Sequence, residues 1–240
     1  MKIFKSALIK LVLVNPILIT PILMIMGLFA FNAYANAPFL DPSLKGEKKV
    51  IMINPAGHAG DPGRSLSGFE RAATFRFAQE LQSAFERGYD FRVVLTRVPG
   101  EKIVDFQNAS FANRLNVDLF ISVHLFKLDS VKPKVYVYQH VTDPVGDFAS
   151  RSFPALKMVS VLQAHQVNIF KTKNIGQHLA DTFSSVDNQK LFDFGGFYGI
   201  PLKPLCGVVA PALLIEVGVN QDDDWHVVLD SIVQGIGRLV

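Results

Sequence analysis

The chain has 240 residues, with 24 lysines and arginines, 21 aspartates and glutamates, and a formal net charge of +3. Residues 1–35 hold three lysines and no acid, so the rest of the chain is balanced at 21 basic and 21 acidic residues and has no basic stripe for nucleic acid. Cys206 is the one cysteine of the sequence, which excludes an internal disulfide.

The amino-terminal segment has the pattern of an export signal. Lysines precede an apolar run over residues 11–31, which is 21 residues long, and an Ala-x-Ala exit follows it. This pattern predicts a signal peptide and processing site over residues 1–37. The run is also long enough to span a bilayer, so an uncleaved membrane anchor through residues 11–31 is the alternative. In both cases residues 38–240 are expected outside the cytoplasm, periplasmic or secreted.

Two potential metal ligands frame a loop rich in glycine and proline. The apolar run Val50–Ile53 predicts a buried strand, and the loop that follows it contains His58. Glu70 lies in the first turn of a helix predicted over Glu70–Arg87. An imidazole and a carboxylate beyond a strand end of an open α/β sheet are two ligands that zinc takes.

A structural interpretation of the same loop competes with metal binding. Ser67 and Glu70 have the spacing of a capping box, in which Glu70 would accept N–H groups at the start of the helix. His58 would then be an ordinary turn residue. The loop alone leaves both interpretations open, and further ligands have to come from elsewhere in the chain.

The rest of the chain continues the alternation of strands and helices. The predicted elements are strands at Phe91–Leu95, Asp118–His124, Lys134–Gln139 and Val208–Val219, and helices at Glu101–Asn116, Asn174–Phe183 and after Asp222–Asp224. The sequence thus predicts a single α/β domain, residues 38–240, with a mostly parallel central sheet and helices on both faces.

Two details of this pattern are specific enough to test. The helix over Glu101–Asn116 is predicted to turn four apolar side chains inward, namely Ile103, Phe106, Phe111 and Leu115. The segment Ser184–Tyr198, with its Gly195-Gly196 pair, is predicted to be rich in turns.

His124 and Glu216 are the two other candidates for chemistry. His124 ends its predicted strand on the sheet edge that holds the His58 loop, which favours a metal ligand over a buried core histidine. Glu216 lies inside an apolar strand, where an ionised carboxylate is costly unless it is paired, hydrogen-bonded or beside a metal. The alternative for Glu216 is a solvent-facing position near the strand end.

The sequences around these four residues resemble those of the zinc-dependent N-acetylmuramoyl-L-alanine amidases of the Amidase_3 type. GHAGDPGRSLSGFE is similar to the family's Gly-His-Gly-Gly…Asp-Pro-Gly…Glu block. Later blocks of the family are matched by Leu95-Thr96-Arg97, Phe111-Ala112-Asn113, DLFISVH and PALLIEVG. The resemblance covers nearly the whole chain after residue 37.

The resemblance implies a zinc hydrolase acting on peptidoglycan, cleaving the amide between N-acetylmuramic acid and the first L-alanine of the stem peptide. His58, Glu70 and His124 would bind Zn²⁺, and Glu216 would be the catalytic carboxylate. Two histidines and one glutamate leave a fourth coordination position open for water. Glu216 would take the water's proton and pass it to the departing amine.

The chain departs from the family at four places that bear on substrate preference. Ala59 stands for the second glycine of the first block, and Asn108 stands for an arginine. Leu125-Phe126 replaces an asparagine-containing segment, and Val219 replaces a phenylalanine. None of these positions is a predicted ligand or the predicted catalytic acid.

Related periplasmic amidases carry an insert after the fourth strand that can cover the zinc, and residues 141–170 fall at that place. This segment contains no glutamate, so Asp143, Asp147 and His165 are its residues that could reach the metal. An activator protein acting on this regulatory insert is one interpretation, and a surface excursion is the other.

The sequence is also compatible with two functions other than a peptidoglycan amidase. A zinc peptidase or amidohydrolase with another amide substrate is favoured by the altered Leu125-Phe126 edge. A degenerate cell-wall-binding protein would keep the fold without the reaction, but it has no need of a charge at position 216.

Overall fold

The structure, a computed structural model, describes residues 48–66, 68–142 and 160–240. The predicted export segment, Ser67 and the middle of the predicted insert, with Asp143 and Asp147, lie outside the described residues. Residues 48–240 form one compact unit. In the described ranges, no helix combines the length and the apolar character that a membrane crossing requires.

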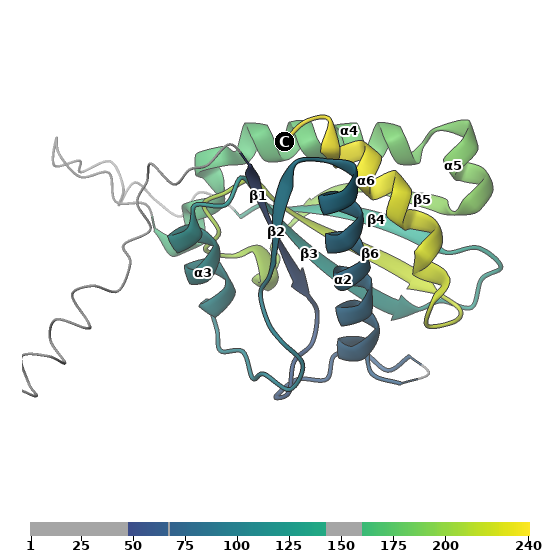
Figure 1. The fold of residues 1–240 in the computed structure, drawn as a ribbon, viewed down its shortest axis with the longest axis horizontal. Helices are drawn as coiled ribbons and strands as arrows, with labels where there is room; N and C mark the ends of the chain where they lie inside the picture. Colours follow the sequence, from purple (N-terminus) through teal and green to yellow (C-terminus); the bar gives the residue numbers. More distant parts are fainter. Residues whose placement is uncertain (1–47, 67, 143–159) are drawn as a thin grey trace, which may run out of the picture. The chain divides into compact units, whose positions relative to one another are not determined.

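The described chain forms a six-stranded sheet with the strand order β2-β1-β3-β6-β4-β5 (Figure 1). All neighbouring strands pair in parallel except β4 and β6, which are antiparallel. The strands are β1 (Lys49–Pro55), β2 (Phe91–Leu95), β3 (Leu119–Lys127), β4 (Lys134–His140), β5 (Asp193–Ile200) and β6 (Ala212–Val219). The predicted fold class, a mostly parallel sheet in a single α/β domain, is confirmed.

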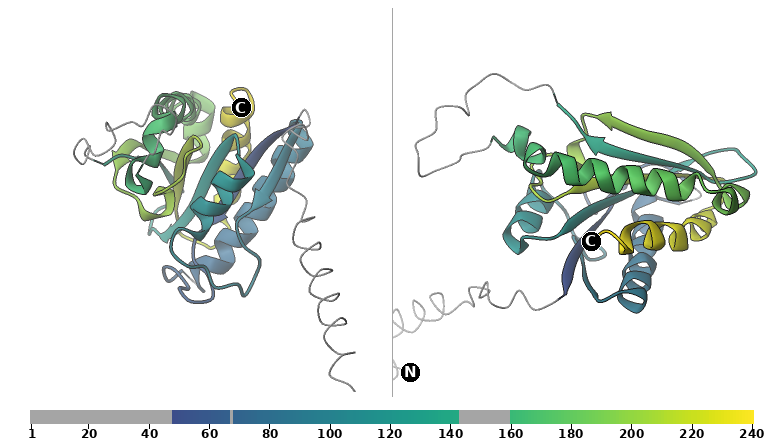
Figure 2. Two further views of the ribbon diagram at one scale, coloured as in Figure 1. Left: turned by 90° about the vertical axis from the view of Figure 1, so that its left-hand side faces the viewer. Right: turned by 90° about the horizontal axis from the view of Figure 1, so that it is seen from above.

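Helices cover both faces of this sheet. Three of them pack side by side on one face (Figures 1 and 2): α2 (Glu70–Gly88), α6 (Leu229–Gly237) and α4 (Ile169–Phe183). The other face is packed by α3 (Gln107–Leu115) and the short η4 (Lys203–Leu205). The remaining elements are η3 (Val161–Asn168), α5 (Val186–Leu191) and η5 (Asp224–Val228).

The two faces have cores of different size. On the α2 face, large side chains such as Phe77 and Trp225, whose rings stack at 4.9 Å, form the main core. On the α3 face, a smaller core joins Met52, Phe120 and Leu214 of the sheet to alanines of α3. This smaller core ends before the carboxyl halves of β3 and β6. The side chains that follow on the same face are therefore free to form a site.

The second predicted helix is shorter than expected. It begins at Gln107 instead of Glu101, because Phe106 adopts the left-handed conformation with φ 60° and interrupts the helical backbone. Phe106 is consequently 51% exposed instead of inward-facing. Ala109 and Ala112 are the buried residues of α3.

Two further expectations about the sheet are wrong. β3 continues to Lys127 beyond His124, since β6 stays paired with it as far as Val219. The segment Ser184–Tyr198 contains α5 and most of β5 where turns were predicted. The Gly195-Gly196 pair belongs to β5, and the ring of Tyr136 lies where a Cβ at Gly195 would be.

A pair of buried histidines lies at the end of β4, away from the predicted site. The rings of His140 and His165 meet edge to face at 4.6 Å, and Nδ1 of His140 accepts the N–H of Leu202 at 2.8 Å. Burial lowers the pKa of each imidazole below the ordinary value of histidine. The neighbouring His165 lowers the pKa of His140 further.

This pair predicts a loss of stability in mild acid. The unfolded chain takes up protons near pH 6.5, the ordinary pKa of histidine, while the folded chain resists protonation until lower pH. We therefore expect the free energy of unfolding to fall as the pH decreases below about 6.5. Urea unfolding at several pH values should show a smaller decrease for His165→Asn than for the parent. Equal slopes for His165→Asn and the parent would contradict the prediction.

Candidate active site

The predicted site residues gather at the carboxyl ends of β1, β3 and β6. β1 ends at Pro55, which is paired with Val123, so His124 lies one residue past the end of its neighbour. In the parallel pair β3–β6, His124 is in register with Glu216. Both side chains therefore lie on the α3 face of the sheet, beyond the small core.

Glu70, the first residue of α2, is held against this edge. It is 3% exposed, and its Oε2 and Oε1 accept the N–H groups of Arg64 at 2.8 Å and Leu125 at 3.1 Å. Burial opposes its charge, but contact with His124 and these two N–H groups bring the pKa of Glu70 below its ordinary value. Phe69 is the N-cap residue of α2 and makes no side-chain cap hydrogen bond, while Ser67, the other half of the predicted capping box, lies outside the described residues.

Glu70 and His124 face each other at a distance that suits a shared metal. Oε1 of Glu70 lies 3.4 Å from Nδ1 of His124. Two ligand atoms about 2.1 Å from a tetrahedral zinc ion are separated by about 3.4 Å, so this pair fits two corners of such a site.

The other nitrogen of His124 belongs to a buried chain of polar side chains. Nε2 of His124 lies 3.1 Å from Oγ of Ser122. The same Oγ accepts a hydrogen bond from Nδ2 of Asn54 at 3.0 Å. Oδ1 of Asn54 in turn accepts hydrogen bonds from Oγ1 of Thr96 at 2.9 Å and from Nδ2 of Asn108 at 2.8 Å. These hydrogen bonds hold the His124 ring with its Nδ1 toward Glu70. None of these positioning residues was predicted, and Asn108 was noted only as a departure.

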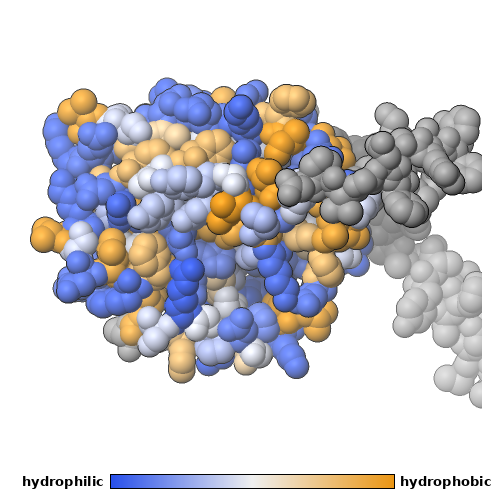
Figure 3. Space-filling view, turned by 180° about the vertical axis from the view of Figure 1, so that it is seen from behind, coloured by the Kyte–Doolittle hydropathy of each residue, from blue (hydrophilic) through white to orange (hydrophobic). Residues whose placement is uncertain are grey.

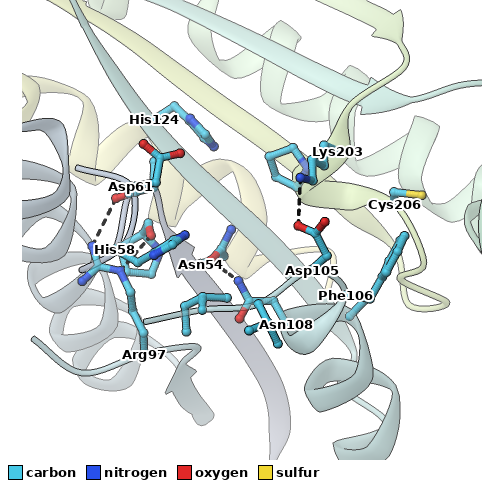
Figure 4. Close-up of a pocket in the computed structure, with 17 residues that line it drawn as sticks. Asn54, His58, Asp61, Arg97, Asp105, Phe106, Asn108, His124, Lys203 and Cys206 are labelled. Atoms are coloured by element: carbon cyan, nitrogen blue, oxygen red, sulfur yellow. Dashed lines mark hydrogen bonds and ion pairs between the residues drawn. The ribbon is translucent and has the colours of Figure 1, made fainter. Parts of the chain in front are cut away.

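His58 is on the same edge but is not yet a third ligand. It lines a pocket of about 230 Å³ together with His124, and Asp61 and Arg97 also line it (Figure 4). Its Nδ1 accepts the N–H of Gly60 at 3.0 Å, and its ring points toward Asn54. No group of three or more His, Cys, Asp or Glu side chains stands close enough to hold a metal within the described residues. Binding by all three predicted ligands thus requires the His58 ring to turn.

Hydrogen bonds within the loop after His58 fix its first turn. The backbones of His58 and Asp61 bond to each other in both directions, and Oδ1 of Asp61 accepts the N–H of Gly63 at 3.1 Å. Gly63 has φ +76°, and a Cβ there would collide with the carboxylate of Glu70. Glycine is therefore required at position 63 for the loop to close over Glu70.

Glu216 is held by two partners that sequence analysis did not identify. Oε1 of Glu216 pairs with Nη1 of Arg64 at 2.5 Å, and Oε2 accepts the hydroxyl of Tyr138 at 3.0 Å. Burial and the Glu216 charge raise the pKa of Tyr138, so its hydroxyl stays protonated and donates. For Arg64, the one signal in the sequence was its position in the first matched block. The contact of Tyr138 with Glu216 could not be predicted, because it depends on the antiparallel pairing of β4 with β6.

A sequence profile of the N-acetylmuramoyl-L-alanine amidase family, Amidase_3, matches residues 51–236. No curated protein sequence matches the chain significantly.

Three solved structures share this fold at sequence identities below 25%, so they support the fold alone. The catalytic domain of CwlV, an N-acetylmuramoyl-L-alanine amidase from Bacillus (Paenibacillus) polymyxa var. colistinus, is 18% identical with a TM-score of 0.56, covering 79% of this chain and 97% of that one. AmiC2 of Nostoc punctiforme is 16% identical with a TM-score of 0.55, covering 78% and 94%. Ami1 from Mycobacterium abscessus is 15% identical with a TM-score of 0.53, covering 78% and 96%.

Proposed function

The chain belongs to the Amidase_3 family of N-acetylmuramoyl-L-alanine amidases, enzymes that hydrolyse an amide of peptidoglycan, and we propose that it does so with zinc bound by His58, Glu70 and His124 and with Glu216 as the proton-transfer group. The observation that supports the proposal most is the 3.4 Å separation of Glu70 and His124 directly beside Glu216. The bond cleaved is the one between N-acetylmuramic acid and the first L-alanine.

The protein side chains have separate tasks in this reaction. Zinc, when bound, would supply the Lewis acidity that polarises the amide carbonyl and activates water. Glu216 accepts a proton from the attacking water and delivers it to the departing nitrogen of alanine. Arg64 and Tyr138 each hold one oxygen of Glu216, so the carboxylate is oriented before substrate arrives. The loop of residues 56–69 carries His58 and Arg64 together.

Digestion of purified cell-wall sacculi tests the function. The expected products are glycan strands bearing free lactyl carboxylates and stem peptides with a free amino-terminal alanine, identified by mass spectrometry, and a chelator should prevent their appearance. Cleavage of another amide would favour the peptidase or amidohydrolase alternative. Binding to sacculi without any release of peptide would favour a wall-binding protein.

The hydroxyl of Ser122 should matter for the metal through His124. A partner on the second ring nitrogen orients a histidine ligand, and losing such a partner commonly weakens metal affinity by roughly 10–100-fold. We expect Ser122→Ala to weaken zinc binding by this order in a competition titration with a chromogenic chelator. Ser83→Ala, on the exposed side of α2, is the control. An unchanged affinity in Ser122→Ala would show that the polar chain does not support the ligand.

Export of the protein is part of the proposal. The lysine-rich start, the apolar run and the Ala-x-Ala exit support delivery to the periplasm or the exterior, where peptidoglycan is found. Amino-terminal sequencing of the exported protein should start near residue 36 or 38. A sequence that starts at Met1 would instead identify residues 11–31 as a membrane anchor.

A partner protein acting on residues 141–170 also belongs to the proposal. The described end of this segment exposes large apolar side chains, at 53% for Val161, 50% for Leu162 and 82% for Phe170. On the side of the molecule opposite to that of Figure 1, hydrophobic side chains gather across the upper middle of the surface (Figure 3). His165 packs against His140 and so does not approach Glu70 or His124. Exposed apolar groups of this kind favour recognition by a protein.

A further inference from the structure

An unbroken strip of aromatic rings begins beside Glu216 and runs toward the edge of the sheet. The ring centroids of Phe126 and Tyr136 are 6.2 Å apart, those of Tyr136 and Tyr138 6.2 Å, and those of Tyr138 and Tyr198 5.9 Å. Tyr136 is in register with Glu216, and the hydroxyl of Tyr138 bonds to Glu216. The strip, defined by these four rings, therefore lies next to the catalytic carboxylate.

Glycines make room for three of the rings to lie against the backbone. A Cβ at Gly218 would come within 2.6 Å of the Phe126 ring, and one at Gly195 would collide with the Tyr136 ring. A Cβ at Gly196 would collide with the side chain of Tyr198. Of the four rings, that of Tyr198 is 47% exposed, and Phe126, Tyr136 and Tyr138 are half-buried.

The chemistry of the strip suits an amphipathic ring better than an aliphatic chain. The guanidinium of Arg64 lies 5.7 Å from the Phe126 ring centroid, and the ammonium of Lys134 lies 5.5 Å from the Tyr136 ring centroid. Apolar ring faces thus alternate with hydroxyl and cationic groups. A pyranose has the matching pattern, because its C–H face packs on an aromatic face while its hydroxyls reach polar neighbours.

The position of the strip across the sheet gives the substrate a direction. The pocket that contains His58, Asp61 and Arg97 lies over β1 and β3, whereas the strip lies mainly over β4 and β5. His124 and Glu216, on β3 and β6, stand between the two. Neighbouring strands are about 4.8 Å apart, so β6 to β5 offers about 10 Å, enough for one or two sugar rings.

We propose that the aromatic strip binds the sugar rings of the glycan strand, which directs the stem peptide into the polar pocket on the other side of Glu216. The proposal rests on the proposed function, because only a substrate joining a sugar to a peptide has these two halves. It assigns Tyr136 and Tyr198 as glycan-binding residues of the known reaction.

Binding of glycan strands freed of stem peptides tests this assignment without requiring hydrolysis. The measurement uses the full exported protein carrying Glu216→Gln, with isothermal titration. Tyr136→Ala and Tyr198→Ala should each weaken binding by roughly five- to tenfold, as expected for the loss of one stacked ring. Tyr136→Phe and Tyr198→Phe keep the ring and should stay within about threefold of the parent. Phe170→Ala removes an exposed aromatic ring on α4 and is the matched control.

The outcomes separate this inference from the proposed function. Unchanged glycan binding in Tyr198→Ala, the most exposed ring, overturns the inference even if sacculi are digested normally. Equal weakening by Phe170→Ala also overturns it, because binding would then be nonspecific. Glycan binding that depends on the strip, in a protein that cleaves no cell-wall amide, supports the strip and rejects the reaction. In the active protein, Tyr198→Ala should raise KM for sacculi by a similar factor with little change in kcat.

Discussion

Replacing Glu216 with glutamine is expected to lower the rate of cell-wall hydrolysis by about 10²–10⁴-fold, the usual contribution of a positioned general base. Glutamine keeps the volume of the side chain and can still accept the hydroxyl of Tyr138, but it cannot take a proton from water. It also loses the charge that pairs with Arg64. Release of stem peptide from sacculi, followed by mass spectrometry, gives the rate.

The zinc content of the variant distinguishes a base from a ligand. Glu216→Gln should retain about one zinc per chain, since the proposed ligands are His58, Glu70 and His124. Loss of zinc would identify Glu216 as a ligand and make the assigned role wrong. Full activity with zinc retained would assign the proton transfer to another group. Glu80→Gln, on the exposed side of α2, serves as the control for loss of one carboxylate.

Removal of a zinc ligand should have an equally large effect on activity and a larger one on metal content. We expect His58→Ala and His124→Ala each to reduce zinc from one per chain to well below that stoichiometry, because two protein ligands hold the metal poorly. Activity should fall with the metal. Elemental analysis of protein purified without added zinc gives the content, and His178→Ala is the matched control on α4.

The ligand variants also test the turn of the His58 ring. If His58→Ala keeps a full complement of zinc while His124→Ala loses it, the contact between His58 and Gly60 is its final arrangement and another group completes the site. Glu70→Ala is a less clean test, because the N–H groups of Arg64 and Leu125 would lose their acceptor. An unsatisfied buried N–H costs about 1–3 kcal/mol, so loss of zinc could then follow from local unfolding.

Hydrophobic pattern was sufficient to predict the elements that carry the site. The apolar runs of β1, β3 and β6 are continuous and largely buried, as in most parallel sheets, and they place His124 on β3 and Glu216 on β6. The spacing of apolar residues from Ala73 to Phe85 predicted α2 to within one residue. These patterns are local in the sequence, and the folded protein retains the strands and the helix that they predict.

Contacts between distant segments explain what the sequence did not predict. β5 contains glycines because rings of Tyr136 and Tyr198 pack where their Cβ atoms would be, whereas glycine in a single sequence indicates a turn. The pairing of Arg64 with Glu216 joins residues 152 positions apart. Nδ1 of His58 accepts the N–H of Gly60, and no periodicity encodes such a contact.

The double attachment of Arg64 has a mechanical consequence. Its backbone N–H holds Glu70 and its side chain holds Glu216, so a single residue links the carboxylate proposed for the metal to the carboxylate proposed for the proton. Because both attachments belong to one residue, a shift of the backbone at position 64 would disturb the two carboxylates together. A change of the Arg64 side chain would instead remove the pairing with Glu216 and leave the N–H on Glu70 in place.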